Sequence, residues 1–214
     1  MIALLKIIAI DIILSGDNAI VIAMATKGLP KKQQNKAIFI GTAGAVFLRI
    51  IFAIVIVYLL QIPFVHLIGG LLLLFIAYHV LVDDEHDADI RSSGNLLKAI
   101  GTIIMADAVM SLDNVVAVAG AAHGHIGMIA IGVAISIPIM IFGSKLIVNV
   151  MDKYSWIAYF GAGILAWTAG EMIISDTFIL DNFNFTDNPV KYVLITVVTI
   201  LVLLIGYMRN QKKA

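Results

Sequence analysis

Two short polar stretches decide the fold of this chain: Asp11-Ile12-Ile13-Leu14-Ser15-Gly16-Asp17-Asn18 and Asp107-Ala108-Val109-Met110-Ser111-Leu112-Asp113-Asn114. When the first Asp of one is aligned with the first Asp of the other, six of fifteen positions are identical, namely two Asp, one Ser, one Asn and two Ala. Both stretches lie in strongly apolar surroundings, where carboxylates are costly and are kept for function. The repetition therefore predicts a functional site built from two related halves.

The composition is that of a membrane protein. Of 214 residues, 61% are hydrophobic and 13% charged, with a mean hydropathy of +1.04, which is too apolar for a soluble domain. The formal net charge of zero gives no basic field for nucleic acid, and the absence of cysteine excludes disulfides and thiolate metal sites. The N-terminus has no basic region or cleavage site, so we interpret it as a retained first span.

Hydrophobic segments of about 20 residues, the length needed to cross a bilayer, predict an all-α, polytopic membrane protein with about seven transmembrane helices. Polar or Gly/Pro-containing breaks separate these segments. The predicted spans are 1–25, 37–60, 63–82, 95–121, 126–149, 155–176 and 189–208.

The repeat extends beyond the polar stretches. The same offset aligns Arg49 with Lys145 without an insertion, and Gly69 to His79 resembles Gly161 to Glu171 in its small-then-aromatic pattern. Each half thus has three spans, and an odd number inverts the second copy, as in many secondary transporters. The predicted organisation is two three-helix inverted repeats plus one C-terminal helix, within a single membrane domain. Its parts are a first repeat at 1–82, an acidic cytoplasmic loop at 83–94, a second repeat at 95–176, and an outer loop, seventh helix and basic tail at 177–214.

Lys and Arg in short loops predict the orientation. With seven spans, the first loop, the fifth loop and the tail share one side, and they contain most of the loop Lys and Arg residues: Lys27, Lys31, Lys32, Lys36, Lys153, Arg209, Lys212 and Lys213. We therefore expect the N-terminus outside and the C-terminus in the cytoplasm. The acidic loop is either a solvated cytoplasmic loop or a weak collector of cations.

The polar side chains of each stretch have the chemistry of a cation site. On a straight helix Asp11, Ser15 and Asn18 share a stripe, with Asp17 about a third of a turn away. An unwound backbone at Gly16 would bring all four together, and Leu112 stands at that position in the second copy. Carboxylates, amides and hydroxyls suit Mn²⁺, Ca²⁺ or Mg²⁺ better than Cu⁺ or Zn²⁺.

The intramembrane charges do not balance. The expected acids are Asp11, Asp17, Asp107, Asp113 and Glu171, and the bases are Arg49 and Lys145. A divalent cation and one proton would neutralise the excess, which gives a physical route to cation/proton exchange. The alternative is that Asp11 with Arg49, and Asp107 with Lys145, are buried ion pairs that only fix helix packing. Glu171 is either a metal or proton carrier or a paired structural acid.

The paired motifs, together with Ala166-Trp167-Thr168-Ala169-Gly170-Glu171 in the sixth span, resemble the TerC family, most closely its short seven-span bacterial members. The resemblance covers essentially the whole chain and implies a bacterial inner-membrane location. The family was named for tellurite resistance, is implicated in manganese export and in supplying metal to exported proteins, and is grouped with the LysE-type exporter superfamily. Carried over by motif, the implied metal residues are Asp11, Asp17, Asn18, Asp107, Asp113 and Asn114, with Ser15, Ser111 and Glu171 on the metal or proton pathway.

The predicted function is secondary export of a divalent cation, with Mn²⁺ as the expected substrate and no catalytic cofactor. One alternative is a non-transporting subunit that supplies metal to exported proteins or supports a tellurite stress complex, with a secretion-machinery partner or a homo-oligomer as its setting. Another is an exporter of small organic cations or amino acids. An intramembrane aspartyl hydrolase is disfavoured because acid and base roles need unlike environments, whereas these aspartates are repeated symmetrically.

Overall fold

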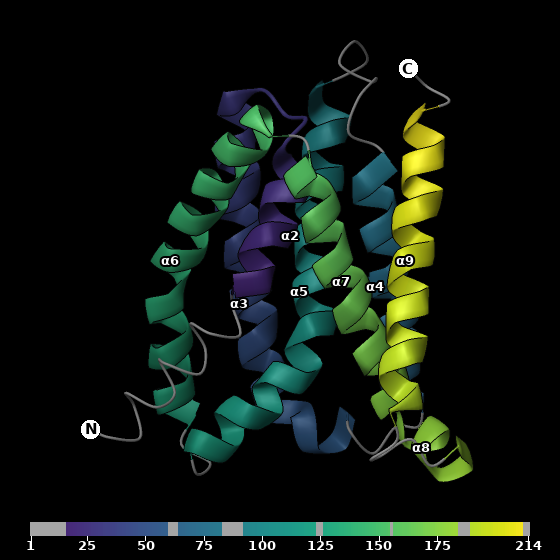
Figure 1. The fold of residues 1–214 in the computed structure, drawn as a ribbon. Coiled ribbons are helices and arrows are strands. Elements are labelled where there is room, and N and C mark those ends of the chain that lie inside the picture. The colour runs from purple at the N-terminus through teal and green to yellow at the C-terminus, as the bar shows by residue number, and fades with distance from the viewer. Residues whose placement is uncertain are drawn as a thin grey trace.

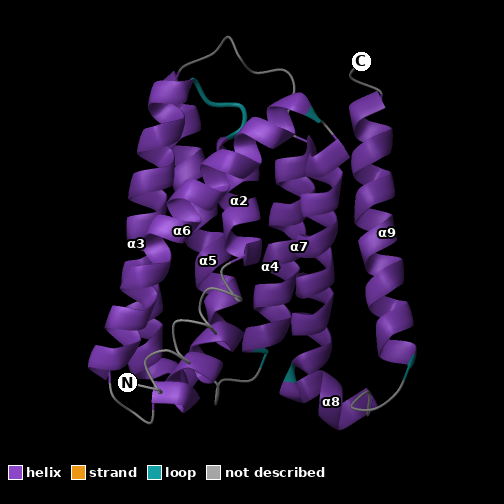
Figure 2. Ribbon diagram, turned by 60° about the vertical axis from the view of Figure 1, so that its left-hand side comes forward, coloured by secondary structure: helices purple, strands orange, loops and turns teal. Residues whose placement is uncertain are grey.

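The computed structural model describes residues 16–59, 64–82, 92–122, 126–154, 156–183 and 189–211. Within these residues the chain is helical and contains no strand (Figure 2). Five of the helices are long and apolar enough to cross a membrane. The prediction of an all-α, polytopic membrane protein is confirmed. The described helices are α2 (Gly16–Thr26), α3 (Lys31–Leu59), α4 (Val65–Val82), α5 (Ser92–Ala122), α6 (Ile126–Lys153), α7 (Trp156–Ser175), α8 (Thr177–Phe183) and α9 (Val190–Gln211).

Two boundaries differ from those expected. Helix α3 begins six residues earlier than predicted, at Lys31, because the Pro30 carbonyl accepts the backbone N–H groups of Gln33 and Gln34 at 2.8 and 2.9 Å. The segment after α7 was predicted as a loop and contains the short helix α8. Asp176 precedes α8 and accepts the backbone N–H of Phe178, so an Asp followed by an apolar run was the missed signal of a helix N-cap.

The helices pack as two related halves (Figure 1). Helix α3 packs extensively on α5, and its repeat counterpart α6 packs on α2. Helices α4 and α7, which occupy matching places in the two halves, pack on each other, as do α2 and α5. The division into two inverted three-helix repeats stays a prediction from the sequence. Helix α9 lies outside the repeat, against α7 and α4.

One end of the bundle is basic. The C-terminal ends of α2, α6 and α9 and the N-terminal end of α3 lie together at the top of Figure 1. These ends contain Lys27, Lys31, Lys32, Lys153 and Arg209, whereas Lys191 lies at the opposite end of α9. The assignment of that side to the cytoplasm rests on the positive-inside rule.

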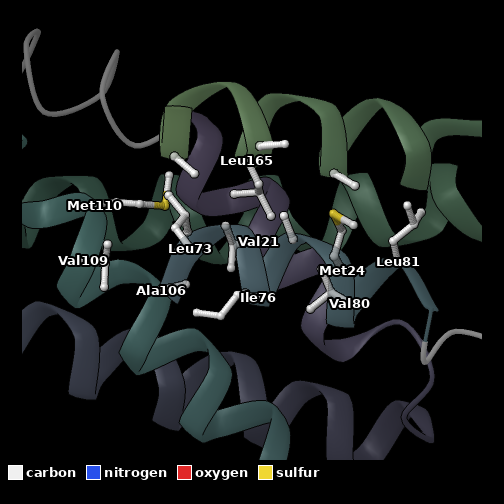
Figure 3. Packing of buried hydrophobic residues seen from close by; sticks show 14 of the residues in the cluster. Val21, Met24, Leu73, Ile76, Val80, Leu81, Ala106, Val109, Met110 and Leu165 are labelled. Carbon is white, nitrogen blue, oxygen red and sulfur yellow. The ribbon is translucent and has the colours of Figure 1, made fainter. Parts of the chain in front are cut away.

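The main apolar core joins the two halves (Figure 3). Val21 and Met24 of α2 contact a cluster that includes Leu73 of α4, Met110 of α5 and Leu165 of α7. Small residues let these helices approach closely, as transmembrane helix packing requires. Gly70 is an example in which the facing backbone comes close, because a Cβ atom added there would lie 2.7 Å from the Ala169 carbonyl oxygen.

We expect Gly70→Ala to lower the free energy of unfolding by about 1–3 kcal/mol, because the new methyl group must push α4 away from the α7 backbone. Thermal unfolding in detergent, followed by the fluorescence of the two tryptophans, measures this. Gly101→Ala in α5 is the matched control, because an added Cβ there meets nothing within 4 Å. Equal stability of the two variants would contradict the close α4–α7 contact.

Candidate functional site

A buried ion pair joins the two repeats. The Nη2 atom of Arg49, on α3, lies 2.6 Å from Oδ1 of Asp107, on α5, and the two residues are 1% and 5% exposed. Glycines make this reach possible, because a Cβ added at Gly41 would lie 2.8 Å from Ile103, and one at Gly44 2.7 Å from Ile104. The α3 and α5 backbones therefore run close together, and the Arg49 side chain spans the remaining gap.

Ser111 completes a closed triangle with this pair. It lies one turn after Asp107 on α5 and is fully buried. Nε of Arg49 donates to the Ser111 hydroxyl at 3.0 Å, and that hydroxyl donates to Oδ2 of Asp107 at 3.2 Å. Both carboxylate oxygens of Asp107 are therefore engaged, one by the guanidinium directly and the other through the serine.

Helix α2 brings a second polar pair toward this triangle. Asp17 is partly buried and interacts electrostatically with both Arg49 and Asp107. Its Oδ1 atom accepts the backbone N–H of Asn18 at 3.0 Å. The site therefore forms where α2, α3 and α5 meet, and these three helices contact one another.

Asn18 is the unusual member of the site. It is 2% exposed, yet neither its side-chain oxygen nor its side-chain nitrogen has a hydrogen-bond partner among the described residues. An unpaired buried amide costs about 1–3 kcal/mol, so native proteins rarely retain one without a reason. A bound cation that is coordinated by the amide oxygen of Asn18 would supply that reason.

The structure describes only part of the predicted metal set. Asp11 and Ser15 lie outside the described residues, and the side chains of Asp113 and Asn114 are not described, although α5 runs continuously through both positions. Helix α5 is therefore not unwound at Leu112. Within the described part of the chain, no group of three or more His, Cys, Asp or Glu side chains converges. The members of the predicted set whose side chains are described are Asp17, Asn18, Asp107, Ser111 and Glu171.

The alternative pairing of Asp107 with Lys145 does not occur in the structure. Asp107 pairs instead with Arg49 of the other repeat, because the glycines of α3 bring that helix against α5. Lys145 is partly buried on α6 and makes no ion pair with a described residue. The suggested pairing of Arg49 with Asp11 involves a residue outside the described range.

Glu171 lies apart from this arrangement. Its side chain is exposed on α7, and its Oε1 atom accepts the indole N–H of Trp167 at 3.0 Å. The two residues are one turn apart on the same helix. Its described contact is thus a local hydrogen bond on the outside of the bundle.

Thr42 and Asp176 are two of the buried polar side chains that sequence reasoning missed. The Thr42 hydroxyl of α3 is fully buried and has no hydrogen-bond partner among the described residues. Its spacing of seven residues from Arg49 places it on the same face of α3, and that spacing was an available signal. The other is Asp176, which is 1% exposed and accepts the backbone N–H groups of Leu67 and Phe178, both at 3.0 Å.

Asp176 binds the first turns of α4 and α8 at once, so we expect Asp176→Ala to lower the free energy of unfolding by about 2–3 kcal/mol. Thermal unfolding in detergent would show this as a lower midpoint. Asp181→Ala is the matched control, since Asp181 is an exposed carboxylate on α8, and it should change stability by less than about 0.5 kcal/mol. An Asp176→Ala variant with the stability of the wild type would show that these two hydrogen bonds, to Leu67 and Phe178, do not stabilise α4 and α8.

Comparison with known proteins gives a consistent family assignment. The model of the integral membrane protein TerC family matches residues 1–214. The membrane protein YjbE of Bacillus subtilis is 49% identical over 176 residues, which cover 82% of this chain and 81% of YjbE.

More distant relatives are longer than this chain. YkoY of B. subtilis is 27% identical over 193 residues, which cover 80% of this chain and 59% of YkoY. The inner membrane protein YoaE of Escherichia coli is 25% identical over 171 residues, which cover 71% of this chain and 33% of YoaE. The names of these relatives describe membrane proteins and give no substrate. No solved structure matches the chain.

Proposed function

Because the chain belongs to the TerC family of integral membrane proteins, we propose that it is a secondary transporter that exports a divalent cation, with Mn²⁺ as the main substrate. The observation that carries this proposal is the buried amide of Asn18, which has no hydrogen-bond partner among the described residues and follows Asp17 on α2, the helix that contacts α3 and α5. A role in helix packing alone gives that amide no partner within the described part of the chain.

The donor atoms favour a hard or borderline metal ion. Asp17 and Asp107 provide carboxylate oxygens, Asn18 an amide oxygen and Ser111 a hydroxyl. Such all-oxygen sets suit Mn²⁺, Mg²⁺ and Ca²⁺. The nearest sulfur in sequence, that of Met110, belongs to a side chain of the apolar core. We propose that Asp11, Asp113 and Asn114 complete the set, as the repeat implies.

The position of the site suits alternating access. It lies between helices of the two repeats, where inverted-repeat transporters place their substrates. Rocking of one repeat against the other would expose the oxygens to each side in turn. The basic end of the bundle would face the cytoplasm of a bacterial cell, so export moves the cation away from that end. We further propose that a proton replaces the cation on a carboxylate that no basic group neutralises.

Two other functions remain as outcomes of the test. A subunit that hands metal to exported proteins would bind the cation without moving it. An exporter of amino acids or organic cations needs space for a carbon skeleton, which the close α3–α5 packing at Gly41 and Gly44 disfavours.

Equilibrium binding of ⁵⁴Mn²⁺ to the purified protein tests the substrate class. We expect saturable binding that Ca²⁺ and Mg²⁺ compete for to different extents and that lysine does not displace. Asp17→Asn should weaken Mn²⁺ binding about tenfold or more. The matched control is Asp152→Asn, which alters an exposed carboxylate at the end of α6 and should bind as the wild type does. Displacement by lysine, or equal effects of the two variants, would contradict a divalent-cation site.

A further inference from the structure

We infer that the Arg49 guanidinium takes the place of the transported cation when the carrier is empty. It then binds the side chains of Asp107 and Ser111, and it moves away from them when the cation binds. The inference rests on the proposed function and adds to it the identity of the group that neutralises the empty site. In this role Arg49 does not bind the cation, and the cation must displace it from Asp107.

The contacts of the triangle carry the inference. Nη2 of Arg49 lies 2.6 Å from Oδ1 of Asp107, and Nε of Arg49 donates to the Ser111 hydroxyl at 3.0 Å. The serine in turn donates its proton to the other oxygen of Asp107. A metal ion could reach these oxygens only after the guanidinium has left, because two cations repel each other strongly in so buried a place.

Burial makes the substitution necessary. Arg49 and Asp107 are 1% and 5% exposed, and an isolated carboxylate at this depth would be strongly disfavoured. With the guanidinium in place, Asp107 is neutralised without any cation from solution. An empty carrier could therefore return across the membrane, whereas a carrier with an unpaired Asp107 could return only with a cation bound.

The exchange needs little movement of the helices. Helices α3 and α5 stay in close contact through Gly41 and Gly44, so Asp107 remains within reach of the long Arg49 side chain whether or not a cation is bound. The inference therefore places the movement in the Arg49 side chain, which opens or closes access to the oxygens of Asp107 and Ser111.

Transport measurements in two modes test this role on the purified full chain in proteoliposomes. Net uptake is measured as ⁵⁴Mn²⁺ entering vesicles without internal Mn²⁺, and exchange is measured against unlabelled internal Mn²⁺. We expect Arg49→Gln to reduce net uptake about tenfold or more while exchange stays within about threefold of the wild type, because only the empty carrier is trapped. Lys32→Gln removes an exposed positive charge from the same helix and should preserve both modes.

The Arg49→Lys variant provides a second test that does not depend on Arg49→Gln folding. Lysine keeps the charge but lacks the planar fork that engages Asp107 and Ser111 together, so it competes less well with the cation. We expect Arg49→Lys to bind Mn²⁺ several-fold more tightly than the wild type and to retain net uptake.

The outcomes separate the inference from the proposed function. Full net uptake by Arg49→Gln, loss of both modes in a variant that still binds Mn²⁺, or weaker Mn²⁺ binding by Arg49→Lys would each overturn the inference and leave export standing. A wild-type protein with neither net uptake nor exchange would overturn the proposed export, and the inference with it.

Discussion

Replacing Asp107 by alanine is expected to lower the free energy of unfolding by about 3–5 kcal/mol, because it removes the carboxylate that pairs with the buried Arg49 charge. The Arg49 side chain is fully enclosed, so water cannot take the place of the lost carboxylate. Denaturant unfolding of the purified protein in detergent, followed by tryptophan fluorescence, measures the loss.

A double substitution separates the loss of a partner from the loss of packing. Asp107→Leu combined with Arg49→Met removes both charges and should recover most of the stability, as replacing a whole buried ion pair by apolar residues generally does. Asp152→Ala removes an exposed carboxylate and should leave the free energy of unfolding almost unchanged. A double variant as unstable as Asp107→Ala would show that the pair is not the source of the effect.

Replacing Asn18 by leucine is expected to separate stability from transport. Leucine has a similar shape and removes a buried amide that has no hydrogen-bond partner among the described residues, so the free energy of unfolding should be unchanged or raised by up to about 2 kcal/mol. If the amide oxygen is a ligand of the cation, Mn²⁺ transport should fall about tenfold or more in the same protein.

Unfolding and ⁵⁴Mn²⁺ uptake measured on one preparation decide the role of Asn18. A stable Asn18→Leu protein that transports normally would remove this residue from the proposed site. An unstable protein would show that the amide has a structural partner in the folded chain.

The sequence predicted the helices well because each span carries its own signal. Long apolar segments were enough to place the beginnings of α4 and α5 to within three residues, whereas α3 begins six residues before its predicted start. The repeat follows from the two polar motifs and stays a prediction. Helix α8 was missed because it is too short to give a periodic pattern.

The partners of the charged residues could not be predicted in the same way. Aligning Arg49 with Lys145 shows that they occupy equivalent positions, but it does not say which acid each one meets. That choice depends on how closely the helices approach, and Gly41 and Gly44 decide it in favour of Arg49 with Asp107. The direction of the Glu171 side chain, out of the bundle, is likewise a property of packing.

The most direct test of the central claim is uptake of ⁵⁴Mn²⁺ into proteoliposomes that contain the purified protein, beside vesicles with Asp17→Asn and with Asp113→Asn. The proposal predicts saturable uptake by the wild type and its loss in both variants, with Asp152→Asn transporting normally. Mn²⁺ binding without flux in the wild type would contradict export and favour a subunit that hands metal to another protein.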